Sequence, residues 1–108
     1  MKLIHSLNEL QEAKQTNPLL LLYIGAESCG VCKVILPRVQ KLAERYRNLT
    51  AVGLQADESP EVTGELGVFT IPCLLIFIEG KETVRQARYI NLEELEQQLD
   101  RYHQIMNT

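Results

Sequence analysis

Two cysteines separated by two residues are the side chains of this sequence best placed to do chemistry. They occur in the segment Cys29-Gly30-Val31-Cys32, which a short turn at 26–28 separates from residues 19–25, an apolar run typical of a buried strand. On a helix, a spacing of three places two side chains on one face, about 5–6 Å apart at Cβ. We therefore expect two thiols that form a reversible disulfide after a small adjustment.

The order of the two cysteines predicts different tasks for them. Cys29 would lie at the N-terminal end of a helix, where free N–H groups and the helix dipole stabilise a thiolate. We expect its pKa to fall below the free value of about 8.5, so that Cys29 attacks a substrate disulfide. Cys32, one turn deeper and more buried, would then attack the Cys29 sulfur and release the reduced substrate.

Two other interpretations of the pair stay open. A structural zinc site needs a second pair of ligands, and the remaining candidates are Cys73, His5 and His103, in unrelated contexts. Two inert, reduced thiols are the other interpretation, which burial within a helix would favour and a strand-to-helix turn does not. We expect no metal, and no bound cofactor, because a disulfide itself carries the electrons.

Hydrophobic patterns predict the elements that must position this pair. Strands are predicted at 2–4, 19–25, 49–56, 73–78 and 83–88, and helices at 6–15, 29–47, 57–65 and 91–106. The resulting order is β-α-β-α-β-α-β-β-α, with parallel crossovers first and a hairpin near the end. This order predicts an α/β fold in which helices flank both faces of a mixed central β-sheet.

Length and composition limit the class of protein. The 108 residues make one ordinary domain, expected to span 1–108, and three cysteines are too few for a disulfide framework. A net charge of −3 argues against nucleic-acid binding. No segment approaches the ~18–20 apolar residues of a membrane span. Because the N-terminal residues lack the apolar region of a signal peptide, we expect a cytoplasmic protein with mostly reduced cysteines. We also expect a monomer.

The sequence resembles the thioredoxin family over nearly its whole length. Residues 26–33, Ala-Glu-Ser-Cys-Gly-Val-Cys-Lys, match the family's A-E-W-C-G-P-C-K segment with two substitutions, and residues 67–72, Gly-Val-Phe-Thr-Ile-Pro, match its G-I-x-x-I-P segment. The resemblance implies the thioredoxin fold and a thiol–disulfide oxidoreductase that reduces disulfides of proteins or small thiols. It also implies an electron donor, either a thioredoxin reductase or a low-molecular-weight thiol.

The resemblance further implies a substrate-binding loop beside the cysteines. The proline that ends the family's G-I-x-x-I-P segment corresponds to Pro72. The Ile71–Pro72 bond would then be cis, as it is in that family. The backbone of Ile71 would pair with the bound substrate chain, a short form of strand addition. Gly30 and Val31 complete the expected substrate-binding residues. Without the cysteine pair, an ordinary trans turn would be the simpler interpretation of this segment.

Several positions depart from the family pattern. Ser28 replaces a tryptophan that covers the site, and its hydroxyl could cap the helix instead. Tyr23 and Gly53 replace a buried aspartate and its partner lysine, which removes the family's usual proton relay. Glu27, Tyr23 or water could substitute, although a phenol with a pKa near 10 is a poor base at neutral pH.

Three further residues leave function partly open. Val31 replaces a proline between the cysteines and should loosen the first helical turn, and Arg88 replaces a glycine that leaves room for a docking partner. Cys73 is expected to pack as a buried strand residue, with a regulatory disulfide or metal contact as the alternative. Besides the oxidoreductase, we therefore keep two alternatives: a thioredoxin-like binding module with weak or no turnover, and a metal-binding thiol protein.

Overall fold

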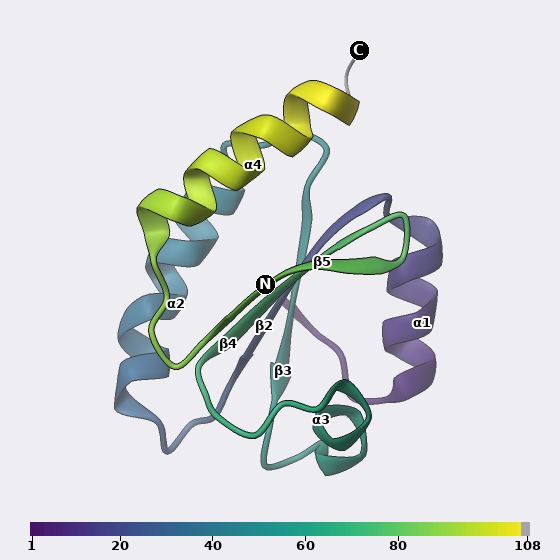
Figure 1. Ribbon diagram of the computed structural model, residues 1–108. Helices are drawn as coiled ribbons and strands as arrows, with labels where there is room; N and C mark the ends of the chain where they lie inside the picture. Colours follow the sequence, from purple (N-terminus) through teal and green to yellow (C-terminus); the bar gives the residue numbers. More distant parts are fainter. Residues whose placement is uncertain (107–108) are drawn as a thin grey trace.

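A five-stranded β-sheet lies between helices in the computed structural model of the chain, which describes residues 1–106 (Figure 1). The last two residues of the predicted domain lie outside the described part. The strands are β1 (Lys2–Leu3), β2 (Leu19–Gly25), β3 (Thr50–Gln55), β4 (Cys73–Ile78) and β5 (Lys81–Ala87). The helices are α1 (Leu7–Thr16), α2 (Gly30–Ala43), α3 (Pro60–Leu66) and α4 (Leu92–Met106). This order of elements confirms the sequence prediction.

The sheet is mixed, as predicted, and β2 runs through its centre. The strand order is β1-β3-β2-β4-β5, in which β3 pairs in parallel with β1 and β2. The β2–β4 and β4–β5 pairs are antiparallel. All seven residues of β2 are buried, which explains its unbroken apolar sequence, since a strand covered on both faces has no solvent side.

Alternate residues of β2 pack against different pairs of helices. Leu22 and Ile24 belong to the core cluster that includes α1 and α3. Leu21 and Tyr23 belong to the cluster that includes α2 and α4. Because side chains alternate along a strand, Tyr23 is fixed on the sheet face that carries α2.

Helix α2 ends at Ala43, earlier than the predicted end near Arg47. The Tyr46 amide donates to the Ala43 carbonyl, a tighter turn than that of an α-helix. Tyr46 still reaches the core, and its hydroxyl donates to the Asp100 carboxylate at 2.6 Å. The apolar sequence pattern therefore extends beyond the end of α2. Tyr46 fits the pattern because the tight turn after the helix still directs its side chain into the core.

Helix α4 follows its sequence signals closely. The Asn91 side chain accepts a hydrogen bond from the Glu94 amide at 3.0 Å, as expected for the predicted capping box. Leu95 and Leu99 are fully buried against the sheet. Within residues 1–106, no helix combines the length and the apolar character needed to cross a membrane.

The ends of three strands meet at one edge of the sheet. Ile24 near the end of β2 pairs with Cys73 at the start of β4, and Cys73 pairs with Ala87 at the end of β5. The Arg88 amide then donates to the Pro72 carbonyl at 2.7 Å. The loop after β2, the segment before β4 and the loop after β5 therefore lie together, near the N-terminal end of α2 (Figure 1).

Arg88 offers a test of this edge, because its φ of 73° lies in the left-handed region. That conformation costs an L-residue about 1–2 kcal/mol and is worst for β-branched side chains. We expect Arg88→Val to lower the free energy of unfolding by about 1–2 kcal/mol. Arg88→Gly should stay within about 1 kcal/mol of wild type, since relief of strain offsets the extra unfolded-state entropy. Urea unfolding measures both, and equal stabilities for the two variants would contradict the backbone constraint.

Candidate active site

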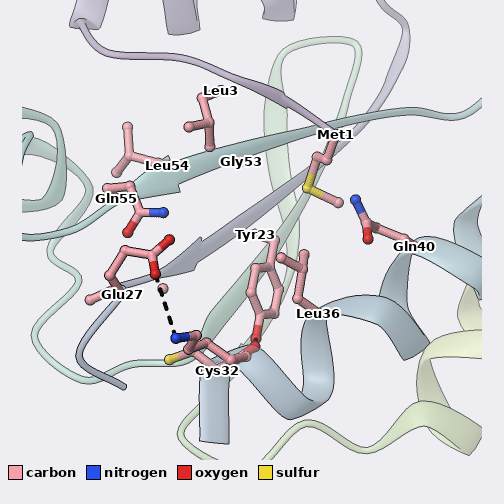
Figure 2. A pocket seen from close by; sticks show the side chains of 13 residues that line it. Met1, Leu3, Tyr23, Glu27, Cys32, Leu36, Gln40, Gly53, Leu54 and Gln55 are labelled. Carbon is pink, nitrogen blue, oxygen red and sulfur yellow. Dashed lines mark hydrogen bonds and ion pairs between the residues drawn. The ribbon is translucent and has the colours of Figure 1, made fainter. Parts of the chain in front are cut away.

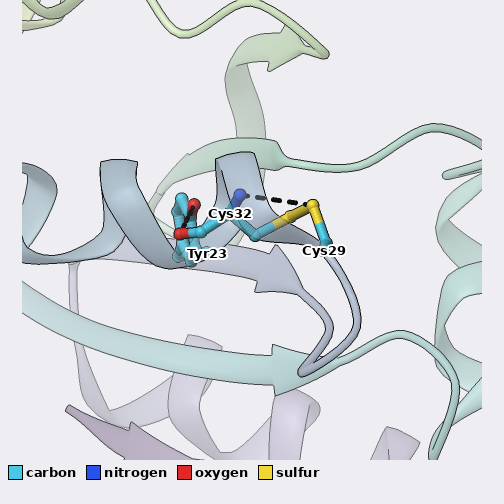
Figure 3. The surroundings of a disulfide bond; sticks show 3 residues. All are labelled: Tyr23, Cys29 and Cys32. Carbon is cyan, nitrogen blue, oxygen red and sulfur yellow. Dashed lines mark hydrogen bonds between the residues drawn. A yellow bond between two sulfur atoms is a disulfide. The ribbon is translucent and has the colours of Figure 1, made fainter.

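Cys29 and Cys32 form a disulfide at the N-terminal end of α2, with their Cα atoms 5.3 Å apart (Figure 3). Cys29 is the residue that caps the helix, and its sulfur accepts a hydrogen bond from the Cys32 amide at 3.2 Å. The predicted alternative cap, Ser28, is not used. An N–H group aimed at the Cys29 sulfur stabilises negative charge there, so reduction would leave a favoured thiolate site.

The two cysteines differ in their access to solvent. Cys32 is only 3% exposed, whereas Cys29 is half-buried. Gly30 is exposed, and Val31 is 59% exposed and forms part of the surface next to Cys29. Of the two cysteines, Cys29 is therefore the one more open to a partner in solution.

Gly25, at the end of β2, sets how closely Cys32 approaches the sheet. A Cβ atom at position 25 would lie 3.1 Å from the Cys32 Cβ and 3.4 Å from its sulfur. A Cβ there would therefore press on the Cys32 side chain, which would have to shift slightly to make room. Sequence patterns did not single out Gly25, although a glycine ending an apolar strand is a signal for close approach.

Tyr23 supports the same turn from below. Its hydroxyl donates a hydrogen bond of 2.7 Å to the backbone carbonyl of Cys32 (Figure 3). Burial raises the pKa of Tyr23 to about 12, so the phenol stays protonated at neutral pH. The structure thus places Tyr23, one of the two residues expected as a possible proton relay, at the site. Its hydroxyl, however, donates its hydrogen to the backbone oxygen of Cys32.

The segment before β4 completes the site from the neighbouring strand. The Ile71–Pro72 peptide bond is cis. Pro72 is buried and Ile71 is partly buried against the core that includes α1 and α3. Cys73 pairs with Ile24 near the end of β2. Ile71 and Pro72, which directly precede Cys73, therefore lie at the edge of the sheet where the loop to Cys29 begins.

Cys73 itself faces away from the disulfide. It is 1% exposed and packs with Ile24 and Leu75 in the core cluster on the α1 and α3 side. Burial raises the pKa of its thiol. The prediction of a core residue is confirmed. Among the described residues, no three His, Cys, Asp or Glu side chains gather as a metal site would require.

A pocket of about 250 Å³ opens beside Cys32, on the face of the sheet that carries α2 (Figure 2). Met1, Leu3 and Leu36 contribute apolar walls, and Glu27 and Gln55 contribute polar groups. Within residues 1–106, the Gln55 Oε1 atom is buried and has no hydrogen-bond partner. Sequence reasoning missed Gln55, although its two-residue spacing from Gly53 on β3 places both on one face.

Comparisons with known proteins agree with this geometry. Residues 4–101 match the family model named Thioredoxin. The chain is 34% identical over 102 residues to thioredoxin-like protein YdfQ of Bacillus subtilis, which covers 94% of this chain and 91% of that protein. It is 33% identical over 90 residues to thioredoxin of Alicyclobacillus acidocaldarius, covering 82% and 86%. Oxidised mitochondrial thioredoxin 3 from Saccharomyces cerevisiae is similar in structure, with a TM-score of 0.83, 25% identity and 93% coverage of each chain.

A disulfide so placed exchanges with other thiols and disulfides, and the chain is a thiol–disulfide oxidoreductase. It belongs to the thioredoxin family. Members of this family act on disulfides through their own active-site disulfide and need no bound cofactor. The predicted thioredoxin fold is confirmed, with a mixed five-stranded sheet flanked by four helices.

The two buried phenols make stability depend on pH in the alkaline range. Burial raises the pKa of Tyr23 to about 12, and burial with the Asp100 hydrogen bond does the same for Tyr46. Because the folded pKa exceeds the unfolded value, this stability is complete below pH 10 and is lost as the pH rises through 12. We expect the free energy of unfolding to fall over that interval.

Tyr23→Phe should reduce this alkaline loss and should cost about 1 kcal/mol at pH 7, because it removes the hydrogen bond to Cys32. Urea unfolding at pH 8 and pH 11 provides the measurement. Tyr89→Phe is the matched control, since Tyr89 is 80% exposed and should leave the pH dependence unchanged. A Tyr23→Phe variant that loses as much stability as wild type would refute the linkage.

Proposed function

We propose that this protein reduces disulfides in other proteins, with Cys29 as the attacking nucleophile and Cys32 as the resolving thiol. The observation that carries the proposal is the asymmetry of the pair. Cys29 is only half-buried and its sulfur accepts the Cys32 N–H, whereas Cys32 is 3% exposed. A nucleophile needs access and a stabilised thiolate, while a resolving thiol needs only proximity to the first sulfur.

The proposed reaction has two exchange steps. The Cys29 thiolate attacks one sulfur of a substrate disulfide, forming a mixed disulfide and expelling the other substrate sulfur as a thiolate. Cys32 then attacks the Cys29 sulfur, which forms the Cys29–Cys32 bond and releases the second substrate thiolate. Two electrons pass from the protein dithiol to the substrate, and the protein is left in the disulfide state seen here.

For substrate binding, we propose the surface formed by Gly30, Val31, Ile71 and Pro72. Exposure of Gly30 and Val31 beside Cys29 supports this assignment. The position of Ile71 two residues before β4 also supports it, because an extended substrate segment could pair with backbone there as a short added strand. The substrate's disulfide would then lie over the Cys29 sulfur.

We further propose that the protein works as a monomer in the cytoplasm, where a thioredoxin reductase or a low-molecular-weight thiol re-reduces it. The names of its relatives, thioredoxin and thioredoxin-like protein, support the reductive direction. A dithiol that donates electrons needs a reducing compartment. Trapping the thiols in growing cells by alkylation should find Cys29 and Cys32 mainly reduced, and a mainly oxidised pair would contradict this placement.

Reduction of insulin by dithiothreitol tests the activity. Wild type should accelerate insulin precipitation, and Cys29→Ser should lower the rate to the uncatalysed background, because no other thiol is accessible to start exchange. Cys73→Ala is the control, since Cys73 packs away from the disulfide and its loss should preserve activity. Equal rates for wild type and Cys29→Ser would refute the reductase proposal.

Cys32→Ser tests the division of labour. It should trap substrates on Cys29 as mixed disulfides that dithiothreitol releases, because the resolving attack is missing. Cell extract incubated with this variant and resolved without reductant gives the measurement. If wild-type partners remain bound when Cys29 and Cys32 are both changed to serine, the protein is a binding module and the two-step scheme fails.

The reduction potential of the Cys29–Cys32 pair tests the direction of electron flow. We expect a value of about −270 mV, which is the potential of thioredoxin itself and not one calculated for this chain. Equilibration with glutathione or dithiothreitol buffers, followed by alkylation, measures it. A value of about −120 mV would identify an oxidant instead.

A further inference from the structure

The resolving step leaves one chemical requirement unmet by the two cysteines alone. Cys32 attacks as a thiolate, so its thiol must first lose a proton. The residue is 3% exposed, and bulk solvent does not reach it freely. Some group beside Cys32 must therefore take up this proton, either directly or through water.

The pocket beside Cys32 is where such a group can act. With a volume of about 250 Å³ it is roomy enough for water. Its polar groups include the Glu27 carboxylate and the Gln55 side chain, whose Oε1 is buried without a partner among the described residues. Figure 2 shows Glu27 and Gln55 on one side of the pocket, with Cys32 below them. Water needs two or more such partners, and Gln55, Glu27 and Cys32 supply them.

The charged and titratable groups around this pocket leave one candidate for the proton. They are Tyr23 from β2, Glu27 from the loop after it, Cys32 and Lys33 from α2, and Met1 with its amino terminus. Tyr23 already donates its hydroxyl hydrogen to the Cys32 carbonyl. Lys33 lies 3.6 Å from the Glu27 carboxylate and is exposed. Glu27 is the one carboxylate among these residues that line the pocket.

We propose that Glu27 accepts the proton of Cys32 through a water molecule held by the buried Gln55 Oε1 atom. The proposal rests on the proposed function, since it concerns the second of the two exchange steps. It gives Gln55 a positioning role, because its Oε1 atom would hold the water between Cys32 and Glu27.

In this step the proton of the Cys32 thiol passes to the bridging water as that water gives a proton to Glu27. The Cys32 sulfur then forms its bond to the Cys29 sulfur, and the bond between Cys29 and the substrate breaks. The bonding electron pair leaves with the substrate sulfur as a thiolate. Glu27 returns its proton to solvent, which has open access to the carboxylate, 78% exposed.

Reaction of the reduced protein with 5,5′-dithiobis(2-nitrobenzoate) separates the two steps. Attack by Cys29 releases one equivalent of coloured thiolate, and attack by Cys32 on the mixed disulfide releases the second. We expect Glu27→Gln to slow the second release roughly 100-fold, the low end of what a positioned general base contributes. The first release should keep its wild-type rate.

Added imidazole distinguishes a proton acceptor from a merely structural residue. In Glu27→Gln the second release should accelerate with imidazole concentration, because a small diffusible base replaces the missing carboxylate, whereas wild type should respond little. Glu58→Gln is the matched control, since Glu58 is an exposed carboxylate outside the pocket. Gln55→Leu should slow the same phase, and combining it with Glu27→Gln should add little, because both changes interrupt one route.

The outcomes separate this inference from the proposed function. Loss of the first release in wild type would overturn the proposed function itself. A normal first release with an unchanged second release in Glu27→Gln would overturn only the role of Glu27. Equal slowing of both releases, or slowing that imidazole does not relieve, would also overturn it, since either result assigns Glu27 a structural part.

Discussion

The hydrogen bond from the Cys32 amide to the Cys29 sulfur depends on where β2 ends. Seven buried residues fix β2 in the middle of the sheet, and Gly25 at its end brings the backbone within contact of Cys32. Tyr23, two residues earlier on the same face, holds the Cys32 carbonyl. Three groups of Cys32 thus hold the first turn of α2 in place: its backbone amide, its backbone carbonyl and its side chain. A thiol pair on a freely moving turn would have neither a defined sulfur environment nor a fixed reach.

The same strand arrangement explains why one sulfur is accessible and the other is enclosed. After Gly25 the chain leaves the sheet. Cys29, the cap of α2, therefore lies near the surface, whereas Cys32, one helical turn later, is buried against β2. The segments before β4 and after β5 lie beside this point. The hydrogen bond from the Arg88 amide to the Pro72 carbonyl joins them. Residues far apart in sequence therefore meet at one edge of the sheet, next to the Cys29–Cys32 disulfide.

Sequence patterns predicted the order of elements and the cysteine pair because both follow from local rules. Buried strands read as apolar runs, and a strand followed by a helix start is recognisable from a few residues. The end of α2 was misplaced because Tyr46 satisfies the apolar pattern from a turn. The pocket could not be predicted at all. It arises between β1, β2, β3 and α2, and no local pattern reports a gap between four elements or the buried Oε1 atom of Gln55.

The N-terminal strand has a practical consequence through its place in the pocket wall. Met1 and Leu3 line the cavity beside Cys32, and a Cβ at Gly53 would lie 3.1 Å from Leu3. Residues attached ahead of Met1, such as an affinity tag, would begin at this wall and alter the surroundings of the resolving sulfur. No residue of α4 lines the cavity within the described chain, so a tag placed after that helix would not start from this wall.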